Sequence, residues 1–257
     1  MSVIPDEYTR RARLHPVVLL ALPMALAITS MVGGVLFDTF ETVGKLLSGG
    51  MLAGLIVGAL LTLANQVGRA GRKHEPYLFH IWGGPPLAVA INGRGAEEHR
   101  TTWRRIRSYL SDKIGVNTDV NEDMPQDRCR DLETELKSLT RDTKKFRRVF
   151  DENCNYGFRR NMFGLKTWGI GSALVSVVIA ALILFADFGK PVWPVLPWST
   201  LLVSLMALVG WWYVTPVWVR FMADAYVSAM RDAGVILARD EREFAAAAQK
   251  NKTKDTA

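Results

Sequence analysis

The stretch WGIGSALVSVVIAALILFA, from Trp168 to Ala186, contains no charged side chain. A helix needs about 20 consecutive apolar residues to cross a bilayer, so this run is long enough to do so. Three further runs of the same kind occupy residues 17–37, 46–64 and 200–219. Buried helices of soluble proteins seldom stay uncharged for so long. The sequence therefore predicts four transmembrane helices.

Charged residues are concentrated between and around these four runs, where they predict parts of the chain outside the membrane. We expect a mainly α, polytopic membrane protein with its helices in two hairpins, a central cytosolic α+β domain and a C-terminal cytosolic helix. The expected boundaries are a cytosolic N-terminus (1–16), a first hairpin (17–65), a cytosolic domain (66–167), a second hairpin (168–219) and a cytosolic helix and tail (220–257).

The distribution of basic residues predicts the orientation of the chain. Cytoplasmic loops of membrane proteins carry an excess of Lys and Arg. The short segments 38–45 and 187–199 hold few basic residues, whereas the other flanks of the four runs hold many: Arg10, Arg11, Arg13, Arg69, Arg72, Lys73, Arg159, Arg160, Lys166 and Arg220. Both termini and the central domain should thus face the cytoplasm from a bacterial inner membrane. Arg159 and Arg160 should meet anionic lipid head groups there.

Small residues recur at four-residue spacing in two of the runs, which predicts close helix packing. The second run has Gly50, Gly54 and Gly58, and the third has Ser172, Ser176 and Ala180. We expect these two faces to contact each other or a second copy of the chain in a homo-oligomer. Pro23 and Pro216 are expected to kink their helices.

The cytosolic domain begins with two short apolar segments, YLFHIW (77–82) and LAVAIN (87–92), separated by GGPP. Apolar runs of this length between turn residues predict a β-hairpin. The following segment, residues 96–114, has apolar residues at helical spacing and predicts a helix.

A second, longer helix is predicted over residues 126–152. Its apolar positions recur at alternating spacings of three and four: Cys129, Leu132, Leu136, Leu139, Thr143, Phe146 and Phe150. This heptad seam can pack between two copies of the chain or within one. Asn153, Asn155 and Gly157 predict the end of this helix, before the third run.

The segment after that predicted helix end is the candidate functional element. We expect a juxtamembrane joint that links the cytosolic domain to the third span. It comprises Asn153, Asn155, Tyr156, Gly157, Phe158, Arg159, Arg160 and Asn161.

No sequence signature of catalysis is present. The chain has no phosphate-binding glycine loop, no HExxH, no GxSxG and no zinc-like spacing of its two cysteines and four histidines. No catalytic, cofactor-binding or metal-ligating residue is therefore assigned. The net charge of +7 is compatible with nucleic acid, but the apolar runs favour a membrane surface instead.

The composition thus favours a non-enzymatic membrane protein whose cytosolic domain binds a partner protein or ligand and couples it to the membrane helices. One alternative is an oligomeric effector that permeabilises the membrane, for example in defence against phage. Another is a membrane-bound enzyme without a readable motif.

Overall fold

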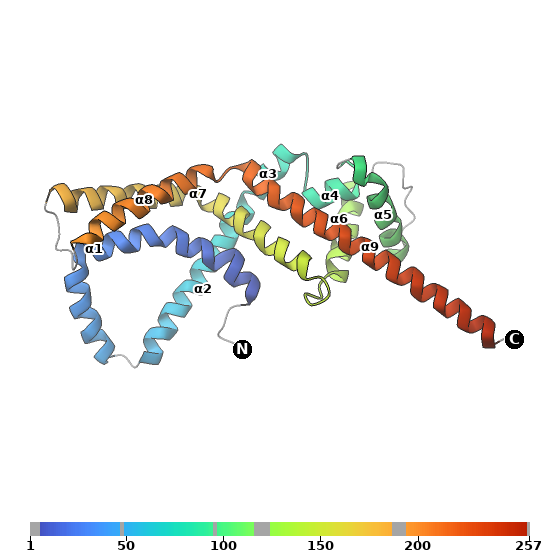
Figure 1. The fold of residues 1–257 in the computed structure, drawn as a ribbon, viewed down its shortest axis with the longest axis horizontal. Coiled ribbons are helices and arrows are strands. Elements are labelled where there is room, and N and C mark those ends of the chain that lie inside the picture. Colours follow the sequence, from blue (N-terminus) through green and yellow to red (C-terminus); the bar gives the residue numbers. More distant parts are fainter. Residues whose placement is uncertain (1–5, 47–48, 95–96, 116–123, 187–193, 256–257) are drawn as a thin grey trace. The chain divides into compact units, whose positions relative to one another are not determined.

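The computed structural model describes residues 6–46, 49–94, 97–115, 124–186 and 194–255. The chain divides into two compact units (Figure 1). Unit 1 comprises Met1–Glu75 and Cys154–Arg220, and unit 2 comprises Pro76–Asn153 and Phe221–Ala257.

Unit 1 contains the long apolar helices. A π-helix, η1 (Thr9–Leu14), leads directly into α1 (His15–Leu46), which is followed by α2 (Gly49–Lys73). The apolar part of α7 (Arg147–Phe185), α8 (Val195–Tyr213) and the start of α9 (Pro216–Asp255) complete it.

The prediction of four spans in two hairpins is wrong. Three helices in the described part of the chain are long and apolar enough to cross a membrane: Thr9–Met31, Arg147–Phe185 and Val195–Tyr213. The predicted span at 46–64 falls largely on α2, which is not among them. This helix begins only at Gly49, its last turns carry Gln66, Arg69, Arg72 and Lys73, and most side chains of its first half lie outside the described part.

The fourth predicted span also has different limits. Pro216 does not kink a helix but begins a new one, because α8 ends at Tyr213 and α9 starts at the proline. Val214 has an extended backbone, with φ −72° and ψ 97°. A proline disfavours helical geometry in the residue before it and suits the first turn of the helix that follows.

Unit 2 is built from shorter helices. These are α3 (Glu75–Trp82), α4 (Pro86–Ile91), the 3₁₀ turn η2 (Glu97–His99), α5 (Arg100–Ile114) and α6 (Gln126–Leu139), together with the start of α7 and most of α9.

The predicted β-hairpin is wrong, because its two strands are the helices α3 and α4, and no strand occurs in the described residues. The turn between them is real: Gly83 and Gly84 adopt φ values of +77° and +132°. Apolar runs of six residues fit a strand and a short helix equally well, so their pattern alone could not decide. Glu75 and Pro86, in the first turns of α3 and α4, are residues that favour helix starts.

The predicted helix 126–152 is two helices. The first, α6, ends at Leu139, and a turn follows in which the Asp142 carboxylate accepts hydrogen bonds from the backbone N–H groups of Lys144 (2.9 Å) and Lys145 (3.3 Å). The second, α7, then runs unbroken from Arg147 to Phe185. The helix end predicted at residues 153–157 is therefore wrong as well.

The core of unit 2 settles how the heptad seam packs. Leu132 and Leu136 of α6 are buried in one cluster with Ile106 of α5 and Met230 of α9. The seam residues of α6 thus pack within their own chain. On α9, Gly234 allows Ile106 of α5 to pack closely against the helix, because a Cβ at this position would lie 3.0 Å from the Ile106 side chain.

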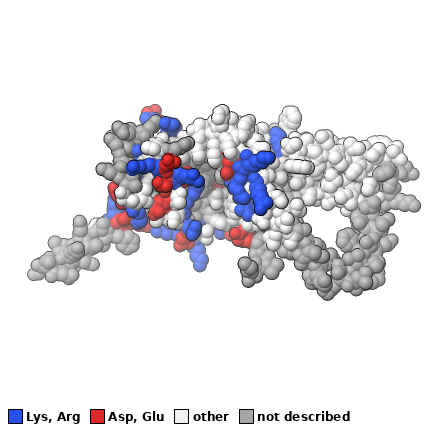
Figure 2. Space-filling model, turned by 180° about the vertical axis from the view of Figure 1, so that it is seen from behind, with Lys and Arg blue, Asp and Glu red and all other residues white. Residues whose placement is uncertain are grey.

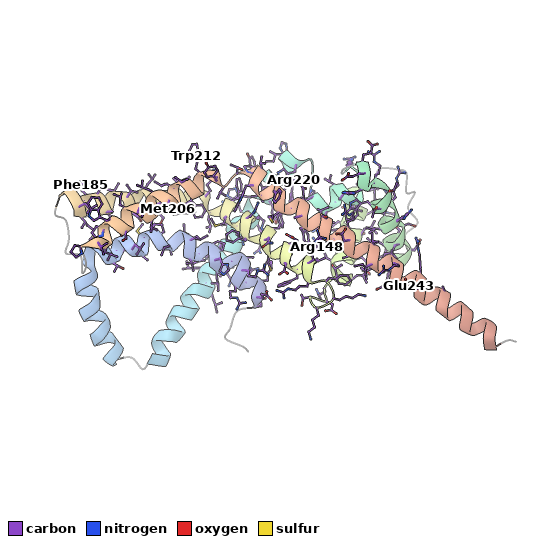
Figure 3. All side chains as sticks on the ribbon, in the orientation of Figure 1. Arg148, Phe185, Met206, Trp212, Arg220 and Glu243 are labelled. Carbon is purple, nitrogen blue, oxygen red and sulfur yellow. The ribbon has the colours of Figure 1, made fainter. Side chains whose placement is uncertain are left out.

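In unit 1, α1 and α8 lie side by side (Figure 1). Buried hydroxyl groups of Ser30 and Thr200 are 2.8 Å apart across this contact. The end of unit 1 that holds the apolar helices is largely white in Figure 2, with few acidic or basic groups. Figure 3 marks three side chains of unit 1 that remain 65–79% exposed, Phe185, Met206 and Trp212.

Candidate functional site

The segment predicted as a juxtamembrane joint lies in the middle of α7 and packs against η1, α2 and α9 within unit 1. Four joint residues, Gly157, Arg159, Arg160 and Asn161, make these contacts together with Gly164 and Lys166 of the next turns, and we call the six residues the juxtamembrane cluster. Glycines allow the close approach. A Cβ at Gly164 would lie 2.6 Å from the carbonyl carbon of Ala70 in α2, and one at Gly157 would lie 3.2 Å from Cβ of Ala12 in η1.

Asn161 is the most buried polar residue of the cluster, with no exposed surface. Its Nδ2 donates a hydrogen bond of 2.7 Å to the carbonyl oxygen of Ala12. In a regular α-helix that carbonyl would bond to residue 16, but Pro16 has no N–H to offer. Asn161 supplies this carbonyl with a donor from another helix.

The other side of the Asn161 amide faces α2. Its Oδ1 has no hydrogen-bond partner among the described residues, and it lies 2.1 Å from the position that a Cβ at Gly71 would take. Only glycine at position 71 leaves room for this amide, so Asn161 and Gly71 fix the approach of α7 to α2.

Arg160 forms an ion pair with Glu75 at the start of α3. The two side chains are only 11% and 24% exposed. An ion pair shielded in this way is sensitive to loss of either partner, because the remaining charge is then left without compensation.

Arg159 binds α9 in two ways. Its Nη1 donates a 2.8 Å hydrogen bond to the carbonyl oxygen of Trp218, and its guanidinium lies 4.6 Å from the centre of the Trp218 ring. Phe158 packs edge-on against the same ring. These contacts tie the middle of α7 to the first turn of α9.

Lys166 stabilises the end of α8. Its Nζ donates to the carbonyl oxygens of Val214 (2.8 Å) and Trp212 (3.5 Å), which have no helical partner beyond the break. A cation at the carbonyl end of a helix also interacts favourably with the helix dipole.

The remaining joint residues are helical and half-buried. Asn153 belongs to unit 2, whereas Asn155 and Tyr156 belong to unit 1. The Tyr156 ring lies 5.7 Å from the Arg160 guanidinium. All eight joint residues thus share one continuous helix, and Gly157, Arg159, Arg160 and Asn161 make its contacts with η1, α3 and α9.

The predicted small-residue faces have different surroundings. Ser176 and Ala180 are fully buried, and Ser172 Oγ donates to the carbonyl oxygen of Leu20, so α7 uses this face against α1. Gly58 is exposed with no atom within 4 Å of a Cβ there. Gly50 and Gly54 also belong to α2, but their surroundings lie outside the described part.

Sequence reasoning missed the partners of the cluster. Glu75, Gly71 and Trp218 are far from α7 in the sequence, and no local pattern links them to it.

The contacts of the cluster are close helix packing, hydrogen bonds and one ion pair. Both cysteines are buried free thiols. Among the described residues, no three His, Cys, Asp or Glu side chains lie close enough to hold a metal ion. Comparison with protein-family models, curated proteins and solved structures finds no match for this chain.

Proposed function

We propose that this chain is a non-enzymatic integral membrane protein in which unit 2 binds a partner protein or ligand outside the bilayer and α7 transmits the change to the membrane helices. One observation carries this proposal. The unbroken helix α7 contains residues of the unit 2 core, then the juxtamembrane cluster, then a candidate membrane span. Sharp kinks in helices usually occur at proline, and α7 contains none, so we expect a displacement at one end of α7 to reach the other.

The exposed surface of unit 1 supports its placement in a bilayer. On α8, Leu202, Met206 and Val209 are 58–65% exposed, and Trp168 and Phe185 of α7 are 73% and 79% exposed. In water such a surface would be a large apolar patch, whereas in lipid it is the normal outer face of a membrane helix.

The juxtamembrane cluster supports an orientation. The N-terminal η1, the end of α2 and the start of α9 all contact the cluster, so these three segments lie together on one side of unit 1. The Lys and Arg residues gathered there favour the cytoplasmic side. We accordingly place the protein in the cytoplasmic membrane with this side facing the cytoplasm.

Hydrogen exchange of the full chain in lipid nanodiscs tests the transmission through α7. Met230→Ala opens a cavity in the unit 2 core, where Met230 is 1% exposed. We expect faster amide exchange in unit 2 and also in residues 154–166 of α7. Arg239→Ala, an exposed position on the same helix, is the matched control and should leave both unchanged.

Faster amide exchange that is confined to unit 2 in the Met230→Ala protein would contradict the proposal, because α7 would then not couple the two units. The alternative function, a permeabilising effector, is tested by measuring the membrane potential of cells that express the wild-type chain. Depolarisation of these cells would favour the effector.

A further inference from the structure

The arginines that the sequence assigned to lipid head groups have partners inside the protein. Arg160 pairs with Glu75, and Arg159 binds the carbonyl and ring of Trp218. Neither guanidinium is presented freely to a membrane surface. The charges that attract anionic lipid must therefore come from elsewhere in unit 1.

Exposed cations line the last turns of α2 instead. Arg69, Arg72 and Lys73 are all exposed, and they follow Asn65 at spacings that place them on one face of the helix. Arg13 of η1 lies against the same face, because its Nη1 donates to Asn65 Oδ1 at 3.4 Å and its Nε would be 3.2 Å from a Cβ at Gly68. We call Arg13, Arg69, Arg72 and Lys73 the α2 basic strip.

The carboxylates at this end of unit 1 do not pair with the three cations of α2. Asp6 accepts a hydrogen bond from the backbone N–H of Thr9, Glu7 pairs with Arg11, and Glu75 pairs with Arg160. Arg69, Arg72 and Lys73 form no ion pair with any described residue. These three side chains consequently keep an uncompensated positive charge, whereas Arg13 interacts with the Asp6 carboxylate.

We propose that the α2 basic strip binds the phosphate groups of anionic lipids. The strip belongs to the unit that contains the candidate spans, and Arg13 lies within the first turns of one of them, Thr9–Met31. Guanidinium groups bind phosphate oxygens with paired hydrogen bonds, and ammonium groups bind them as point charges. The inference rests on the proposed membrane location and adds the chemistry of its lipid partner.

Titration of the full chain in neutral detergent tests the strip. The probe is phosphatidylglycerol, with phosphatidylcholine as the uncharged counterpart, and native mass spectrometry counts the bound lipid. The triple variant Arg69→Gln, Arg72→Gln, Lys73→Gln should lose affinity for phosphatidylglycerol by about fivefold per residue, or about 100-fold in total at low salt. All three positions are exposed, so the helix itself should be retained, as circular dichroism will verify.

A matched control removes the same charge from unit 2. Arg104, Arg105 and Arg128 are exposed there, and their replacement with Gln should leave phosphatidylglycerol binding unchanged. Equal losses in the two triple variants would show an effect of net charge alone and overturn the proposal. Displacement of the lipid by an equal concentration of inorganic phosphate would overturn it too.

Carbonate extraction of membranes distinguishes a failure of the lipid-binding proposal from a failure of the proposed function. A chain that stays in the membrane pellet but does not prefer phosphatidylglycerol would overturn the lipid site alone. A chain released by carbonate would overturn the membrane location and the lipid site together.

Discussion

Asn161 links α7 to the backbone of η1 through a buried hydrogen bond. Pro16 has no N–H to offer the Ala12 carbonyl, and the Asn161 amide donates a buried hydrogen bond to that carbonyl from another helix. Asn161→Ala should therefore lower the free energy of unfolding by about 1–3 kcal/mol, because a buried acceptor is left without a partner. Thermal unfolding of the full chain in detergent measures this loss.

Gln66→Ala serves as the control for Asn161→Ala, since Gln66 is an exposed amide in the same unit. Its unfolding temperature should stay close to that of the wild type. An equal decrease in both variants would contradict the role given to Asn161.

Two glycines of α7 should respond to alanine in opposite directions. A methyl group at Gly164 would meet the α2 backbone at 2.6 Å, whereas one at Gly171 would meet nothing within 4 Å. Gly164→Ala should lower the unfolding temperature, and Gly171→Ala should raise it slightly, because alanine favours a helix by up to about 1 kcal/mol over glycine. Circular dichroism melts of the two variants provide the comparison, and destabilisation of similar size in both would refute the close contact.

Asp142 should make the turn between α6 and α7 sensitive to acid. Hydrogen bonds from the backbone of Lys144, and then of Lys145, lower the pKa of its carboxyl group below the ordinary value of 3.8. The charged form thus stabilises the fold above that value, and this contribution is lost as the pH falls through the lower, folded pKa.

Asp142→Asn should consequently be less stable than the wild type at neutral pH and equally stable in strong acid. Thermal unfolding across this range gives the difference, with the exposed Asp131→Asn as control. A deficit that persists in acid would mean that the carboxylate charge does not stabilise the turn.

At the scale of elements, α9 is held in unit 2 mainly by its apolar face. Met230 is buried in the core, whereas Asp232 pairs with Arg148 at 2.6 Å between side chains that are 40% and 63% exposed. Met230→Ala should lower the free energy of unfolding by about 2–5 kcal/mol, and Asp232→Ala should lower it by less than about 1 kcal/mol. Native-state hydrogen exchange of unit 2 measures both, and a larger effect from Asp232→Ala would reverse this ranking.

Long elements were predicted correctly from the sequence more often than short ones. The apolar runs at residues 168–186 and 200–219 were long enough to indicate helices, and both are helical in the structure apart from the break between Tyr213 and Pro216 in the second run. The six-residue runs in α3 and α4 fit two periodicities, and the strand prediction was wrong. The long heptad seam continued in sequence past Leu139, but the Asp142 turn broke the helix, which hydrophobic spacing alone does not reveal.

The contacts of the predicted joint were not predictable from the sequence. Charge and position singled out Arg159, Arg160 and Asn161, yet each contacts residues that are distant in sequence. Such pairings depend on which helices pack together. A single sequence does not contain that information, so arginines that would have been assigned to lipid prove to bind within the chain.

At the scale of the whole molecule, the proposed function requires that unit 1 faces lipid and that unit 2 lies outside the bilayer. A single introduced cysteine can report whether its position faces lipid or water. The native Cys129 and Cys154 should not interfere, because they are buried and only 3% and 1% exposed. Met206→Cys places a thiol on the apolar face of α8, and Ser138→Cys places one on the exposed surface of α6.

The most direct test is labelling of these two variants with a membrane-impermeant maleimide in membranes opened on both sides. We predict rapid labelling at position 138 and protection at position 206 until detergent dissolves the bilayer. Equal labelling of both positions before detergent is added would contradict the membrane placement of unit 1.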